Sequence, residues 1–320
     1  METKIEPISS SDQIIKVAAQ LAKSGQKKMV AVAGAQDVDV IGALSSSNAD
    51  GILDATLFGD KNKIEEISDK ENIDITNLDV IDQSDPQKAT YEAVKMAAEG
   101  NADVVMKGFV STSALLKTVL SKEFGLRTKN TVSHTAVLDI PGYHKLLSMT
   151  DGGMVVRPNL EQKIQIIENA VLVNKALGIC PVKVALASGV DAEYDSVPSS
   201  LECKKLIDKF AELKIDNVQL QGPLAFDTAT SKEIAQAKNI EGPVVGEADI
   251  YLVSSLEECN IIAKSLINFA DTVFAGVITG ARVPISLVSR TDTLKNKKAS
   301  VSIACLVAEY YKNIGFGETS

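Results

Sequence analysis

The sequence of 320 residues contains no tryptophan, and only 4% of its residues are aromatic. Single-stranded nucleic acids are bound largely by stacking bases on aromatic side chains, so this scarcity argues against such a surface. The net charge of −9 at pH 7 argues against non-specific attraction to DNA or anionic lipid. We therefore expect neither a nucleic acid nor a membrane as partner, while a local cationic pocket stays compatible with the acidic average.

Metal-ligating and redox-active side chains are also scarce. The histidines and cysteines are dispersed, without a CxxC pair, at His134, His144, Cys180, Cys203, Cys259 and Cys305. This set offers no spacing typical of a zinc site, and dispersed cysteines are usually small buried thiols in a reducing cytoplasm. We expect no structural metal.

Long apolar runs are absent as well. No stretch approaches the roughly 18 apolar residues that a membrane helix needs. The N-terminal stretch "METKIEPISSSDQ" carries acidic residues and lacks the apolar core of a secretory signal. With 45% hydrophobic and 23% charged residues, the composition is that of a globular protein long enough for two domains. These features favour a cytoplasmic enzyme.

Short β-branched runs alternate with segments of helical spacing along most of the chain. The runs at 27–35 and 102–108, for example, each precede a segment with the apolar periodicity of a helix. This alternation is typical of βα units in a parallel sheet. In 131–150, two strand-like runs flank "PGYHK", which predicts a β-hairpin. The sequence predicts the α/β class with mainly parallel sheets.

The chain shows no internal repeat and no evident flexible linker. The final helical segment needs a sheet to cover, so we expect the chain to return to its first domain near residue 286. The predicted division is a first α/β domain of residues 1–137 plus 286–320 and a second of residues 138–285.

Polar side chains gather where predicted strands end, which is where open parallel sheets bind ligands. In "VVMKGFVSTSALL", Gly108 allows a tight turn, Lys107 precedes it, and Ser111, Thr112 and Ser113 cluster at a helix start. Hydroxyls, backbone N–H groups and a cation suit a phosphate or acyl phosphate. Ordinary N-capping beside a solvated lysine is the alternative, and the segment does not match a Walker loop.

The stretch "SRTDT" interrupts a run, "GARVPISLV", that reads as a buried strand. Thr291, Asp292 or Thr293 would each suit the N-cap of the helix that follows. Arg290 fits this role less well, because a cation beside a helix N-terminus opposes the helix dipole unless it holds an anion.

Other arginines also fall at predicted strand ends. Arg127 follows Gly125, and Arg282 lies shortly before Ser289. Arg127 by itself is more often a surface cation than an oxyanion clamp, but the two arginines together with Lys107 and Arg290 would form one anion-binding cleft. A GxGxxG fingerprint for a dinucleotide is missing.

The segments "MKGFVSTSALL", "GLRTKNTVSH", "GPLAFDTATS", "ADIYLVSSLEECNIIAKSL" and "GARVPISLVSRTD" together resemble the phosphate acetyl/butyryltransferase family, and most of all its butyryl-type members. The resemblance runs from about residue 28 to 310 with the motifs in order. It implies the two-domain fold shared with isopropylmalate dehydrogenase and an active site in the interdomain cleft. The implied reaction exchanges acyl-CoA and phosphate for acyl phosphate and CoA. It needs no tightly bound cofactor, because coenzyme A is a substrate, and a homodimer or larger homo-oligomer is expected.

The same resemblance assigns residues. Ser289 and Arg290 match the pair that contacts the substrates, and Asp292 takes the catalytic acid of the "SRxD" pattern. The residues assigned to substrate and CoA binding are Lys107, Gly108, Ser111, Thr112, Arg127, His134, Asp151, Arg282 and Thr293. Acetyl-specific members place their aspartate seven residues after the serine, where this chain has Asn296, and Cys259 replaces a glycine of the family's "EAGN".

The implied mechanism is a direct transfer. Asp292 accepts the thiol proton as general base, Ser289 orients the reactants or stabilises the oxyanion, and Arg290 clamps the phosphate. No histidine is near Ser289 in the sequence, which disfavours a covalent acyl-enzyme. The alternatives are a metal- and NAD-dependent dehydrogenase of the same fold, an acyltransferase that uses an acyl carrier protein, and a non-catalytic acyl-CoA sensor.

Overall fold

The computed structural model describes residues 5–289 and 292–317. The chain forms two compact units. The terminal unit comprises residues 11–130 together with 275–317, and the central unit comprises residues 5–10 together with 131–274. Compactness alone does not define independent folding, so the division into residues 1–137 with 286–320 and 138–285 stays a prediction.

The terminal unit is built around strands in the order β3-β2-β1-β4-β11-β10. Their bounds are β1 (Lys28–Ala33), β2 (Leu53–Gly59), β3 (Asp79–Asp82), β4 (Val104–Lys107), β10 (Val273–Thr279) and β11 (Ile285–Ser286). Neighbouring strands run parallel except β10 and β11, which are antiparallel. The central strands are buried along almost their whole length, as the continuous apolar runs predict.

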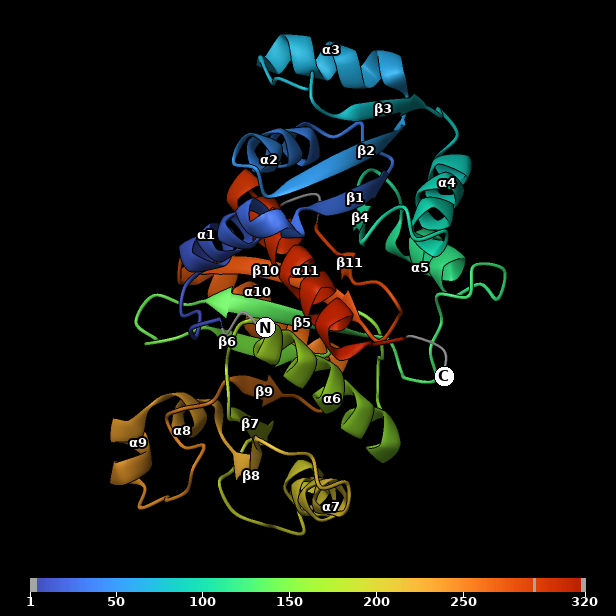
Figure 1. The fold of residues 1–320 in the computed structure, drawn as a ribbon. Helices are drawn as coiled ribbons and strands as arrows, with labels where there is room; N and C mark the ends of the chain where they lie inside the picture. The colour runs from blue at the N-terminus through green and yellow to red at the C-terminus, as the bar shows by residue number, and fades with distance from the viewer. Residues whose placement is uncertain (1–4, 290–291, 318–320) are drawn as a thin grey trace. The chain divides into compact units, whose positions relative to one another are not determined.

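The helices of this unit follow the strands as the alternation predicts. They are α1 (Ser11–Leu21), η1 (Ala22–Gln26), α2 (Val38–Ala49), α3 (Lys61–Glu71), α4 (Pro86–Ala98), α5 (Thr112–Val119) and α11 (Leu294–Ile314). Asp37, Asp60 and Asp85 cap α2, α3 and α4, because each carboxylate accepts a backbone N–H of the first turn. α11 packs against α1 and α2, whereas α4 packs against β1 and β2 on the opposite face of the sheet (Figure 1).

The central unit contains a second set of strands in the order β5-β6-β9-β7-β8. Their bounds are β5 (Ser133–Asp139), β6 (Leu147–Thr150), β7 (Val182–Ala187), β8 (Val218–Leu224) and β9 (Ile250–Leu252). β5 and β6 form the predicted antiparallel hairpin, and the other neighbours run parallel. The α/β class with mainly parallel strands is therefore confirmed.

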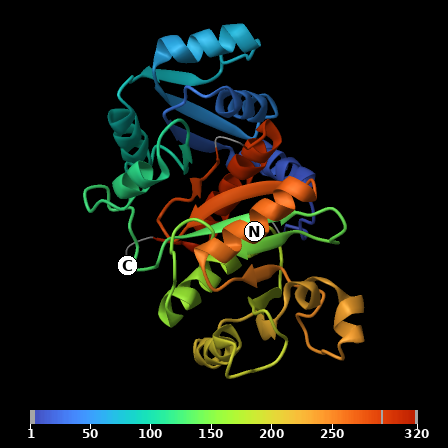
Figure 2. The same cartoon turned by 180° about the vertical axis from the view of Figure 1, so that it is seen from behind.

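Helices cover both faces of these strands. They are α6 (Leu160–Ala176), α7 (Pro198–Glu212), α8 (Phe226–Thr230), α9 (Lys232–Ala237) and α10 (Leu256–Phe269). α6 begins with a capping box between Asn159 and Gln162. Figures 1 and 2 show α6 and α10 on opposite faces of the β5–β6 hairpin. Cys259 of α10 is buried in the apolar cluster formed there with residues such as Leu147 and Met149.

Some elements differ from the predicted ones. The run "GARVPISLV" contains only the two-residue strand β11, because Pro284 has no N–H for a ladder and the chain leaves the sheet after Ser286. The helix that Ser111 caps ends at Val119. The residues of "GPLAFDTA" end β8 and begin the short helix α8, which α9 follows.

Candidate active site

The loop after β4 leaves the sheet through a close contact between two glycines. The backbone N–H of Gly108 donates to the carbonyl of Ala33 over 3.0 Å, and that of Phe109 donates to the carbonyl of Gly34 over 2.5 Å. A Cβ at position 108 would lie 2.1 Å from the carbonyl oxygen of Gly34, a distance that no side chain tolerates. Gly108 is thus required by a close backbone approach at the carboxyl ends of β1 and β4.

The hydroxyl cluster that follows begins α5. The side chain of Ser111 caps the helix by accepting the N–H of Ala114 over 3.1 Å, and its Oγ lies 3.3 Å from Oγ of Ser113. Thr112 is the first residue of the helix. The N-cap alternative therefore holds for Ser111. Both Ser111 and Ser113 are exposed, so contact of this helix start with a phosphate stays a prediction.

Lys107 is buried, with only 7% of its surface exposed, so the alternative of a solvated lysine is wrong. Its Nζ donates to the carbonyls of Gly108 over 3.3 Å and Val288 over 3.4 Å. A buried ammonium is retained only where polar groups compensate for the lost water. This lysine therefore links the end of β4 to the residue that precedes Ser289.

Ser289 and Asp292 are joined by two hydrogen bonds. The N–H of Ser289 donates to Oδ2 of Asp292 over 2.6 Å, and the N–H of Asp292 donates to the carbonyl of Ser289 over 3.2 Å. The N-cap of α11 is Thr293, whose Oγ1 accepts the N–H of Asn296 over 3.2 Å. Asp292 therefore does not cap this helix. Arg290, assigned as the phosphate clamp, lies outside the described residues.

Two ammonium groups and a backbone N–H act on the carboxylate of Asp292. Burial raises the pKa of its carboxyl above the ordinary value, and the N–H of Ser289 together with the ammonium groups of Lys297 and Lys107 opposes that rise. Lys297 was missed by sequence reasoning. It is 1% exposed, and its Nζ donates to the carbonyl of Asp292 over 2.7 Å and lies 3.4 Å from Oδ2 of Asp39. In the sequence it is one of three lysines in "LKNKKAS", and no local pattern distinguishes it.

The two remaining arginines of the terminal unit lie on adjacent backbone segments. Arg127 forms a bridge with Ala281, and the N–H of Arg282 donates to the carbonyl of Leu126 over 2.9 Å. Thr128 closes the contact by donating its hydroxyl to the carbonyl of Gly280 over 2.5 Å. Both arginine side chains are exposed. The structure thus brings Arg127 beside the segment of Arg282, and anion binding by either stays a prediction.

In the central unit, Asp151 lies in a buried turn directly after β6 and contacts the backbone of His134, which belongs to β5. Oδ1 of Asp151 accepts the N–H groups of His134, Gly153 and Met154, and Oδ2 accepts that of Val155, all within 3.2 Å. Asp151 is 3% exposed, so it orders this turn. Burial raises the pKa of its carboxyl, and the four donors oppose the rise. Its assignment to substrate binding stays a prediction.

The imidazole of His134 is buried without a hydrogen bond. Neither Nδ1 nor Nε2 has a partner within residues 5–289 and 292–317, and the ring lies 6.0 Å from that of Phe274. Burial lowers the pKa of His134 from 6.5 to about 4, so the ring is neutral at pH 7. Its assignment to CoA binding likewise stays a prediction.

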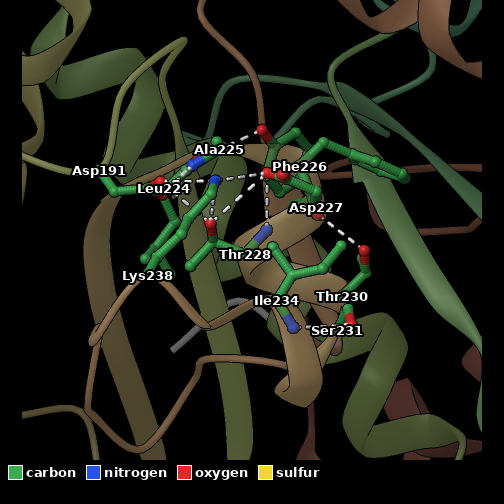
Figure 3. A network of polar contacts seen from close by, with 11 residues as sticks. Asp191, Leu224, Ala225, Phe226, Asp227, Thr228, Thr230, Ser231, Ile234 and Lys238 are labelled. Atoms are coloured by element: carbon green, nitrogen blue, oxygen red, sulfur yellow. Dashed lines mark hydrogen bonds and ion pairs between the residues drawn. The ribbon is translucent and has the colours of Figure 1, made fainter. Parts of the chain in front are cut away.

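A second polar network lies after β8 in the segment "GPLAFDTA". Figure 3 shows the side chain of Lys238 pointing between Asp191 and Asp227. Its Nζ donates to Oδ2 of Asp191 over 2.9 Å, to Oδ1 of Asp227 over 3.0 Å and to Oγ1 of Thr228 over 2.8 Å. The ammonium of Lys238 holds the pKa of Asp227 below its usual range. These groups satisfy one another and fasten the loop after β7 to the start of α8.

Within the described residues, no group of three or more His, Cys, Asp or Glu side chains is placed to hold a metal ion. The four cysteines are all described, and each is a free thiol. No described helix combines the length and apolar character needed to cross a membrane.

The fold and the polar loops at strand ends define an α/β protein in which two buried ammonium groups act on a half-buried carboxylate. Residues 83–305 match the family model described as "Phosphate acetyl/butaryl transferase". The chain is 39% identical over 281 residues to the phosphate butyryltransferase of Clostridium beijerinckii, covering 88% of this chain and 93% of that protein. The chain belongs to this family, and it is an acyltransferase.

Solved structures agree with this membership. A branched-chain phosphotransacylase from Enterococcus faecalis V583 is 29% identical with a TM-score of 0.79, over 88% of this chain and 99% of that one. A 4-hydroxythreonine-4-phosphate dehydrogenase from Klebsiella pneumoniae shares only the fold, at 13% identity and a TM-score of 0.53, over 88% of this chain and 99% of that one. The implied fold shared with dehydrogenases is thereby confirmed. The interdomain cleft stays a prediction.

Proposed function

We propose that the protein is a phosphate acyltransferase that moves a short-chain acyl group reversibly between CoA and inorganic phosphate, with butyryl preferred and acetyl also accepted. The observation that carries the proposal is the junction of Lys107 with the Ser289–Asp292 turn. The buried ammonium of Lys107 at the carboxyl end of β4 and the half-buried carboxylate of Asp292 are the two charges that phosphate binding and thiol deprotonation require. The names of the relatives support the same activity.

The chemistry is a direct transfer within a ternary complex of enzyme, CoA and acyl phosphate. A thiol has an ordinary pKa of about 8.5 and is mostly protonated at neutral pH. Asp292 takes its proton as the sulfur attacks the acyl carbon. The bond between that carbon and the phosphate oxygen then breaks, and the phosphate leaves with its electron pair. Ser289 supplies a hydroxyl for the oxyanion, and Arg290 with Lys107 stabilises the departing phosphate.

A panel of acyl-CoA substrates from acetyl to hexanoyl, each with phosphate, tests this function by the release of free CoA. We expect phosphate-dependent release with a maximum at butyryl. One methylene is worth about 1–3 kcal/mol, so neighbouring chain lengths should differ in kcat/KM by tenfold or more. Release that does not depend on phosphate, or none with any acyl-CoA, would refute the proposal. A maximum at another acyl chain length would change the proposed substrate but not the proposed reaction.

The rivals make different predictions about ligands. A non-catalytic acyl-CoA sensor would bind CoA without turnover, whereas a dehydrogenase of the same fold would bind NAD. We expect CoA to raise the melting temperature by mass action and NAD to leave it unchanged. A rise with NAD alone would favour the dehydrogenase, and a rise with CoA but no turnover would favour the sensor.

The assembly belongs to the same proposal. We propose a homodimer or larger homo-oligomer, and the apolar side chains Ile261 and Phe269 on α10 are 68% and 85% exposed, as expected of a surface that a second copy covers. Light scattering coupled to size exclusion measures the mass. A monomer at micromolar concentration would refute the proposed oligomer and leave the proposed activity unaffected.

A further inference from the structure

The first turn of α11 carries a lysine in an unfavourable place. Lys297 follows the N-cap Thr293 by four residues, and a cation there opposes the helix dipole. Its side chain is 1% exposed, and lysine is almost never buried to this degree unless it is paired. Neither the helix nor the core gains from this placement, so the reason for it must lie in what the ammonium contacts.

Those contacts lead to the candidate base. Nζ of Lys297 donates to the main-chain carbonyl of Asp292 over 2.7 Å. Behind it, Oδ2 of Asp39, in the first turn of α2, lies 3.4 Å away. The ammonium of Lys297 therefore lies between the carboxylate of Asp39 on α2 and the main-chain carbonyl of Asp292.

We infer that Lys297 is a positioning residue that fixes Asp292 for proton transfer and keeps its carboxylate ionised, with Asp39 anchoring the ammonium from α2. This inference rests on the proposed function, because it assumes that Asp292 is the base. Lys297 itself touches neither substrate nor reacting atom in this mechanism.

Among the described residues, the charged groups that act on Asp292 are Lys297 of α11 and Lys107 of β4. Asp39 of α2 contacts Lys297 rather than Asp292. Both lysines lower the pKa of Asp292 against the effect of burial. Without one of these ammonium groups, less positive charge offsets the effect of burial. The pKa of Asp292 should then rise, and the carboxylate should take up its proton at a higher pH.

The test is the pH dependence of kcat/KM for acyl phosphate with CoA in Lys297→Met. We expect the acidic limb of the profile to move to higher pH, with a rate deficit that is greatest in acid and shrinks as the pH rises. Comparison with the wild-type protein in the same buffers cancels the ionisation of the substrates themselves. A lysine that only anchors α11 to α2 would lower the melting temperature and leave the limb in place.

The neighbouring residue offers a matched control. Lys298 also joins α11 to α2, through Asp50 over 2.6 Å and the hydroxyl of Ser46 over 2.7 Å, but it has no contact with Asp292. Lys298→Met should lower stability without moving the limb. If Lys297→Met and Lys298→Met have the same acidic limb as the wild-type protein, the inference is wrong.

A second variant carries the test if Lys297→Met does not fold. Asp39 is 41% exposed, so Asp39→Asn should fold. The amide oxygen of asparagine can still accept from the ammonium and anchor it, while the negative charge that offsets the charge of Lys297 is removed. Lys297 should then lower the pKa of Asp292 further. The acidic limb should therefore move to lower pH, which is the opposite of the shift expected in Lys297→Met. Asp50→Asn is the control, and an unchanged limb in Asp39→Asn would overturn the inference.

Failure of this inference can be told from failure of the proposed function. Asp292→Asn should abolish the acidic limb whatever Lys297 does. If Asp292→Asn abolishes the limb and Lys297→Met leaves it in place, only the positioning role is wrong. If Asp292→Asn keeps the limb, Asp292 is not the base, and the positioning role falls with that assignment. The acyl transfer itself fails only if the acyl-CoA panel gives no phosphate-dependent release of CoA.

Discussion

The N–H of Ser289 donates to the carboxylate of Asp292 over 2.6 Å, and the N–H of Asp292 donates in return to the carbonyl of Ser289. The two residues proposed to orient and to deprotonate the thiol are thus parts of one small turn. A change in the backbone of either displaces both. Substitutions that alter only a side-chain function are therefore the informative ones here.

Asp292→Asn is such a substitution. Asparagine keeps the size and can still accept the N–H of Ser289, but it cannot take up a proton. Turnover should fall by about 10²–10⁴, the usual share of a general base. The deficit should shrink as the pH approaches the ordinary pKa of the thiol, because thiolate that is already formed needs no base. The measurement is kcat/KM against pH, and a silent Asp292→Asn would end the assignment.

Thr293 has a separate role that stability measurements can isolate. It caps α11, the longest of the helices in the described residues, so Thr293→Ala should lower the free energy of unfolding by about 1 kcal/mol. Thr293→Asn should keep most of this stability, because asparagine is about as good an N-cap as threonine. Urea denaturation followed by circular dichroism measures both. Equal losses in the two variants would contradict a cap.

The clamp can be tested although Arg290 lies outside the described residues. Arg290→Ala should cost about 10²–10³ in kcat, the order expected for one lost group that stabilises transition-state charge. The melting temperature should stay close to that of the parent, because the substitution removes a charge assigned to phosphate and no apolar side chain. Arg157→Ala, which removes an exposed arginine with no assigned role, is the matched control. Near wild-type turnover of Arg290→Ala would refute the clamp.

His134 predicts an acid sensitivity of the fold. Burial lowers the pKa of His134 from an ordinary 6.5 to about 4. Between these two pH values the imidazole is protonated in the unfolded chain and neutral in the folded chain. The stability is complete above pH 6.5 and is lost as the pH falls toward 4, by on the order of 3 kcal/mol in total. His134→Phe should reduce this loss. Chemical denaturation at several pH values measures it.

The second histidine serves as the control for that experiment. His144 is 53% exposed, so His144→Gln should leave most of the acid sensitivity in place. If the two variants lose stability in parallel between pH 6.5 and 4, the burial of His134 does not govern the loss.

The sequence predicts those features that depend on local pattern. The strand before Lys107 and the capping hydroxyl of Ser111 follow from periodicity and from helix-start chemistry, and both are present. The hairpin around "PGYHK" is present for the same reason. Ser289 and Asp292, by contrast, were identified by the resemblance to the transferase family and not by local sequence pattern.

Features that depend on distant contacts were not predictable. Lys297 differs from Lys298 only in what lies across from it on α2, and neighbours so far apart in the chain leave no local signal. The choice of Thr293 over Asp292 as N-cap likewise depends on the Ser289 N–H, which occupies the carboxylate. The same holds for Lys107, whose burial depends on carbonyls from two segments.

The contact between Gly34 and Gly108 has a consequence for anyone who wishes to redesign this enzyme. Each glycine faces the backbone of the other's loop, so a methyl group at either position would collide with main-chain or Val110 atoms within 3.2 Å. A mutant library across the loop should therefore hold both positions constant and begin its diversity at Phe109, which is 46% exposed. Randomising the two glycines would fill such a library with chains that cannot close the sheet, and those losses would be mistaken for lost substrate recognition.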